Sequence, residues 1–194
     1  IRHSEKVFNM REFLAVLVLI FSLQSWAKAD DIRDFEIEGM SLGDSLLDFF
    51  SKEEVDKARD ESYADRLFVT KTIDAKDFKL YAGYQFSFKS QDRNKTIEAI
   101  IGVIEYPDNI FKCLEDMKEI VSELSLLFPN AVKKDWGKYE MSNGHYFPVT
   151  FTFKDSSRAM AACFDWNKKS GINDNLKVSL YSAEYREYLK KQKQ

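Results

Sequence analysis

The chain has 194 residues, of which 44% are hydrophobic and 14% aromatic, and only three are proline. This composition can supply a buried core, which excludes an intrinsically disordered protein. The 29 basic and 32 acidic side chains give a net charge of −3. Because nucleic-acid binding depends on clustered positive charge, we expect no nucleic-acid partner.

The N-terminal segment has the pattern of a cleavable secretory signal peptide. Met10 is the expected start, Arg11 supplies a short positive region, and an apolar run covers residues 13–23. An Ala-Lys-Ala cleavage motif follows at residues 27–29. A membrane span needs about 20 apolar residues, which this run does not reach. Since residue 30 is Asp and not a lipid-bearing Cys, we expect no stable membrane anchor after cleavage.

Cleavage would divide the chain into residues 1–29, the upstream residues and signal peptide, and residues 30–194, a single domain. The second part carries 25 basic and 30 acidic side chains, because residues 1–29 hold four of the basic and two of the acidic ones. We therefore expect a mildly acidic protein that is periplasmic or secreted.

Residues 34–58 are expected to form a short strand and then a pair of short helices. Apolar and acidic side chains alternate over residues 34–38, which is the period of a half-buried strand. Residues 41–44 and 51–54 each resemble a capping box, the motif that satisfies free N–H groups at the start of a helix.

The remainder of the chain alternates strands with two further helices. Apolar side chains at i, i+3, i+4 and i+7 predict a long amphipathic helix over residues 108–128, capped by Asp108, and Ser182 is expected to cap a C-terminal helix. Strands are expected at 67–72, 78–81, 84–89, 97–106, 147–153, 158–166 and 176–180. Short turns between strands predict an α+β fold: an antiparallel sheet with the helical pair, the long helix and the C-terminal helix packed on it.

The only two cysteines are expected to pair. Cys113 lies in the apolar stripe of the long helix, and Cys163 shares a strand face with Ala159 and Ala161. Small side chains let a helix approach a sheet closely, and a disulfide requires Cα atoms within about 7 Å. An exported protein also meets an oxidising compartment. The alternative is two buried free thiols.

The sequence holds little catalytic chemistry. His145 is the only histidine after residue 29, so neither a histidine-based triad nor a histidine metal site is expected. The sequence contains neither a phosphate-binding loop nor a dinucleotide fingerprint. We therefore expect no cofactor and no metal. Trp136, Tyr139 and Tyr146 crowd one loop region, where they could stack on a ligand or hold a partner, or form a small satellite core.

The stretch Asp-Phe-Glu-Ile-Glu-Gly-Met-Ser-Leu-Gly-Asp-Ser-Leu-Leu at residues 34–47 resembles a group of small exported bacterial proteins of unknown function. That resemblance implies export and no particular activity. More loosely, Gly39-Met40-Ser41 is similar to a turn in the accessory lipoproteins of outer-membrane β-barrel assembly, which implies a helical pair leading into an antiparallel sheet. The chain lacks their lipid-bearing Cys, and its second half has no counterpart in them, so no functional residue is carried over.

Two functions remain open. The first is an exported envelope protein that binds another envelope protein or a small ligand. The second is a hydrolase of the bacterial envelope that uses carboxylates near one helical corner, namely Asp44, Asp48 and Glu54. Helix capping already explains these carboxylates, so we favour the binding protein.

Overall fold

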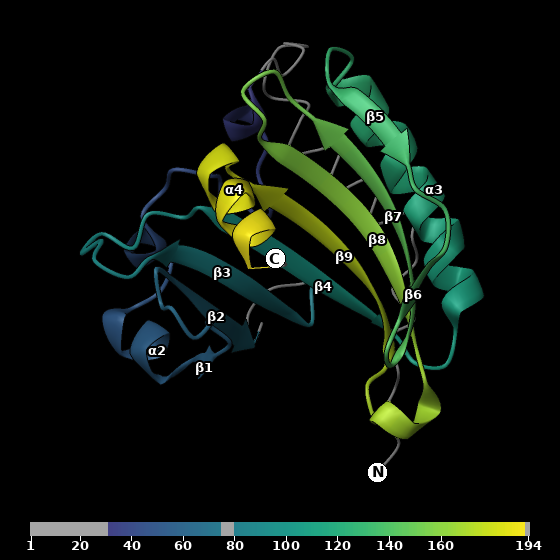
Figure 1. Cartoon of the computed structure of the whole chain (residues 1–194), viewed down its shortest axis with the longest axis horizontal. Coiled ribbons are helices and arrows are strands. Elements are labelled where there is room, and N and C mark those ends of the chain that lie inside the picture. The colour runs from purple at the N-terminus through teal and green to yellow at the C-terminus, as the bar shows by residue number, and fades with distance from the viewer. Residues whose placement is uncertain (1–30, 75–79, 193–194) are drawn as a thin grey trace.

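The computed structural model describes residues 31–74 and 80–192 (Figure 1). The helices are α2 (Lys52–Lys57), α3 (Ile110–Leu127) and α4 (Ala183–Lys191). The strands are β1 (Arg59–Asp60), β2 (Phe68–Asp74), β3 (Gly83–Lys89), β4 (Ala99–Tyr106), β5 (Val132–Asp135), β6 (Tyr139–Met141), β7 (Gly144–Thr152), β8 (Arg158–Trp166) and β9 (Asp174–Tyr181). The predicted signal peptide and the first half of the predicted strand at 78–81 lie outside the described residues.

All nine strands join one antiparallel sheet in the order β1-β2-β3-β4-β9-β8-β7-β5, with β6 also paired to β7. The predicted α+β class is therefore confirmed, together with the long helix and the C-terminal helix. Figure 1 shows the sheet as a strongly curved surface, with α3 behind it and α4 in front.

The α3 side of the sheet carries the main core. The helix packs on β8, β9 and β4, and the predicted apolar stripe is the face it buries. The N-terminal segment covers the adjoining part of the same face, where Phe35 meets Phe128 at 5.5 Å and Phe50 meets Phe86 at 5.5 Å between ring centroids. One contiguous cluster of apolar side chains therefore fills this face.

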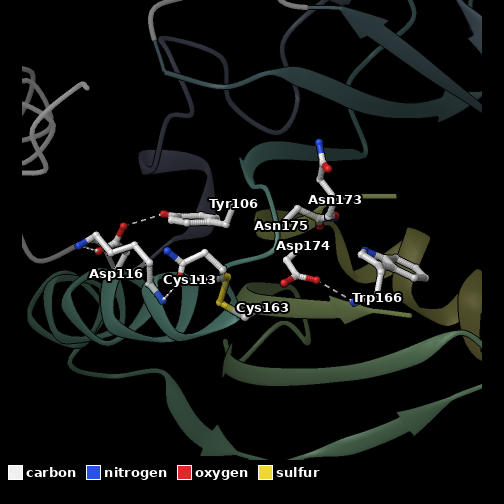
Figure 2. The surroundings of a disulfide bond; sticks show 10 residues. Tyr106, Cys113, Asp116, Cys163, Trp166, Asn173, Asp174 and Asn175 are labelled. Carbon is white, nitrogen blue, oxygen red and sulfur yellow. Dashed lines mark hydrogen bonds and ion pairs between the residues drawn. A yellow bond between two sulfur atoms is a disulfide. The ribbon is translucent and has the colours of Figure 1, made fainter. Parts of the chain in front are cut away.

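The predicted Cys113–Cys163 disulfide is present and joins α3 to β8 (Figure 2). The two Cα atoms are 6.0 Å apart, and both cysteines are fully buried. Ala159 and Ala161, on the same strand face, are also buried, so small side chains do line the contact as expected. In the same region Tyr106 donates a hydrogen bond of 2.8 Å to the buried carboxylate of Asp116 on α3.

The helical pair predicted over residues 41–58 is wrong in its first half. The Ser41 N–H does donate to the Asp44 carboxylate at 2.8 Å, as in a capping box, but a turn and a three-residue 3-10 segment follow instead of an α-helix. The N–H of Gly43 donates to the carbonyl of Ile97, so tertiary pairing competes with the helix. The second box is correct, and Ser51 caps α2.

Two smaller expectations also need correction. Residues 34–38 form no strand: a 3-10 turn covers Ile32–Asp34, and Ile37 pairs with Met40 in an isolated bridge. The long helix is capped by Asn109 and not by Asp108.

On the opposite face of the sheet, α4 is the one described helix, and it covers one end. Ser182 caps this helix as predicted. Tyr185 and Tyr188 pack on Phe68 and Ala99 to form a second, smaller core. The part of this face that β6, β7 and β8 form lies next to α4. The candidate site is located between them. Within the described part of the chain, no helix is long and apolar enough to cross a membrane.

Candidate ligand-binding groove

A groove of about 370 Å³ opens between α4 and the end of the sheet formed by β6, β7 and β8. Small-molecule sites commonly have volumes of about 300–1,000 Å³. Its lining combines aromatic side chains from the sheet with basic side chains from the sheet and from α4. We refer to it below as the α4 groove.

The strand period explains why the sheet side chains converge. Alternate residues of a strand point to the same face, and Tyr146, Pro148 and Thr150 of β7 therefore line the groove together. On the neighbouring strand, Met160 is paired with Thr150 and lines it as well. The opposite set of alternate residues enters the core on the α3 side.

The three aromatic residues singled out from the sequence all line the α4 groove. Tyr139 and Tyr146 are cross-strand partners in β6 and β7, with ring centroids 5.4 Å apart, and Tyr139 meets the edge of Trp136 at 6.2 Å. Trp136 and Tyr139 are 36% and 39% exposed, whereas Tyr146 is half-buried. The structure thus places them at a solvent-facing groove, and the segment expected as a loop contains the β6–β7 hairpin.

Trp136 is held in a defined orientation. Its indole Nε1 donates a hydrogen bond of 3.0 Å to the Thr150 hydroxyl, which fixes the ring to the sheet. The Lys134 ammonium lies 3.4 Å from the ring centroid, a cation–π arrangement. An aromatic side chain that is fixed before a ligand arrives loses little conformational freedom on binding.

Two arginines that no sequence pattern singles out also line the groove. Arg158 begins β8, and Arg186 lies in α4. Arg186 donates a hydrogen bond to the Ser156 carbonyl in the turn between β7 and β8, so it links the helix to the sheet. The Nε of Arg158 is buried and has no hydrogen-bond partner among the described residues.

The two guanidinium groups influence each other. Burial lowers the pKa of Arg158. Burial, followed by the neighbouring positive charge of Arg158, lowers the pKa of Arg186. Tyr181, the cross-strand partner of Arg158, also lines the groove, and burial raises its pKa to about 12. The groove therefore holds cations in a partly desolvated environment.

The carboxylates considered for hydrolysis lie elsewhere. Asp44 accepts a hydrogen bond from the Ser41 N–H, and Glu54 accepts one from the Ser51 N–H at 2.8 Å, which are the capping roles expected from the sequence. Asp48 is exposed, and the lining of the α4 groove includes none of the three.

His145 lies in β7 and contacts two carboxylates. Its Nε2 is 3.1 Å from Glu140, and its Nδ1 is 3.4 Å from Asp165. Within residues 31–74 and 80–192, no group of three or more His, Cys, Asp or Glu side chains could hold a metal ion. No protein-family model, curated protein or solved structure matches the chain.

Proposed function

We propose that this chain is an exported bacterial envelope protein that binds a small ligand in the α4 groove. The observation that carries the proposal is the convergence of Trp136, Tyr139 and Tyr146 on one groove whose volume suits a small molecule. Two of these rings are substantially exposed, and exposed aromatic rings provide apolar contact area with little conformational freedom to lose.

Export is supported by the sequence pattern at residues 10–29 and by the disulfide. Disulfides persist in oxidising compartments such as the periplasm, and they are rare in the cytosol. N-terminal sequencing of the protein from a secreting host should begin at Asp30. A membrane-bound product that retains residues 13–23 would contradict cleavage.

Ligand binding can be tested without knowing the ligand. The protein is incubated with a small-molecule extract of the bacterial envelope, and native mass spectrometry then records any bound mass. We expect Trp136→Ala to weaken the affinity by about tenfold and therefore to lower the occupancy at sub-saturating extract, because truncating a central aromatic contact commonly costs more than 1 kcal/mol.

Phe111→Ala is the matched control, since Phe111 is an aromatic residue on α3 that is 82% exposed. It should retain full occupancy. Equal occupancy in Trp136→Ala and wild type, or no bound mass in any of the three proteins, would contradict the proposal.

A further inference from the structure

We infer that the α4 groove selects small organic anions, with the oxyanion group of the ligand held by Arg158 and Arg186 and its apolar body placed against the aromatic side chains. This inference rests on the proposed ligand binding and adds the chemical class of the ligand. The class is a compact apolar or aromatic molecule that carries one carboxylate or phosphate group.

The charge arrangement is the first support. Neither Arg158 nor Arg186 forms an ion pair with a carboxylate among the described residues, whereas Arg33, Arg59 and Arg66 each do. Lys190 adds a third cation to the lining, although it is paired with Glu187. The described lining contains no Asp or Glu. Although Asp155 and Glu187 offset part of the positive charge of Arg186, a groove whose two guanidinium groups form no ion pair within the described chain is complementary to an anion.

The position of the arginines is the second support. Both arginines line the same groove, and the positive charge of Arg158 acts unfavourably on Arg186. An oxyanion bound in the groove would offset this repulsion and could accept charge-assisted hydrogen bonds from the guanidinium groups.

The remaining lining accounts for the apolar body of the ligand. Pro148, Met160 and Leu189 line the groove together with the three aromatic side chains. An inorganic anion would leave these surfaces without a contact, while an uncharged hydrocarbon would leave the arginines unpaired. The combination therefore favours a ligand with both parts.

The test uses three probes of similar size with the full domain: naphthalene-2-carboxylate, 2-naphthyl phosphate and the uncharged naphthalene-2-carboxamide. Isothermal titration calorimetry should show at least one anion binding about tenfold or more tightly than the amide, since hydrogen bonds to charged groups are the stronger ones. The better of the two anions identifies the preferred oxyanion. Added NaCl should weaken anion binding and leave the amide unaffected.

Variants then locate the anion. Arg158→Gln and Arg186→Gln should each remove most of the preference for the anion over the amide, and each retains hydrogen-bonding capacity. The control is Arg93→Gln, an exposed arginine in the turn between β3 and β4, which should bind like wild type.

The outcomes separate the two proposals. If all three probes bind equally well and Trp136→Ala weakens them, the groove binds ligands but the anion inference is wrong. If the anions are preferred equally by wild type and both arginine variants, the anion site lies elsewhere and the inference is again wrong. If no probe binds and the envelope extract yields no bound mass, both proposals are wrong.

Discussion

Gly102 in β4 leaves room for an aromatic ring on the core face of the sheet. A Cβ atom at this position would overlap the ring of Tyr81, which is buried. Gly102→Ala should therefore displace the ring and lower the free energy of unfolding by about 1–3 kcal/mol, the usual cost of overpacking. Urea unfolding of both proteins measures the difference.

Tyr81→Ala supplies the control for this prediction. In that background the ring is gone, so adding Gly102→Ala should cost much less than it does in the wild type. An equal cost in both backgrounds would mean that the backbone conformation, and not the ring, requires glycine at position 102.

The residues of the groove differ in how far sequence could reveal them. Trp136, Tyr139 and Tyr146 stand out in the sequence because they lie close together in the chain. Arg158 and Arg186 line the same groove because α4 lies beside the sheet face that carries Arg158. Alternation in residues 158–166 does place Arg158 on the face opposite Cys163, but it does not predict which element covers that face.

Secondary structure was predictable where one local pattern acted alone. The stripe of α3 repeats over several turns and meets no competing signal, so the predicted helix is present. Near Ser41 the signal is ambiguous, because the hydrogen bond from the Ser41 N–H to the Asp44 carboxylate can form in a turn or at the start of a helix. Backbone hydrogen bonds from Gly43 to Ile97 and from Leu46 to Lys95 stabilise the turn, and such partners cannot be read from local sequence.

The disulfide that joins α3 to β8 leads to a prediction about stability. Cys113 and Cys163 are 50 residues apart in sequence, so their disulfide closes a long loop in the unfolded chain. In the chain-entropy model, replacing both with Ala should lower the free energy of unfolding by roughly 4 kcal/mol. Urea unfolding checks the magnitude.

Thiol labelling checks that the disulfide is present before its stability contribution is measured. Because both cysteines are fully buried, we expect a reductant to reach the bond only when the structure opens. Mass spectrometry of unreduced protein that is alkylated under denaturing conditions should find neither cysteine labelled, and two labelled cysteines in the exported protein would contradict the bridge.

At the scale of the whole molecule, three buried tyrosines (Tyr81, Tyr84 and Tyr106) and the partly buried Tyr181 lead us to expect a loss of stability at alkaline pH. Burial raises the pKa of Tyr181 to about 12, and burial likewise raises the pKa of Tyr81, Tyr84 and Tyr106. An unfolded tyrosine titrates near pH 10. The unfolded chain thus loses these protons first, so the stabilising contribution is complete below about pH 10 and falls as pH rises towards 12 and beyond.

This prediction is checked by measuring the free energy of unfolding from pH 8 to pH 12 alongside the ultraviolet absorbance of tyrosinate. We expect the absorbance of the buried tyrosines to appear together with unfolding. Ionisation of all nine tyrosines near pH 10 in a protein that stays folded would contradict it.

The position of β9 in the sheet determines which strand edges stay open while the chain is being synthesised. This strand lies between β4 and β8, although it is the last strand in the chain. Until residues 174–181 have emerged, β4 and β8 are both open edges, and β4 is almost entirely apolar. Open apolar edges pair readily with other chains. The growing or shortened chain is therefore the form most in need of protection from aggregation, and arrival of its final strand is what closes the sheet.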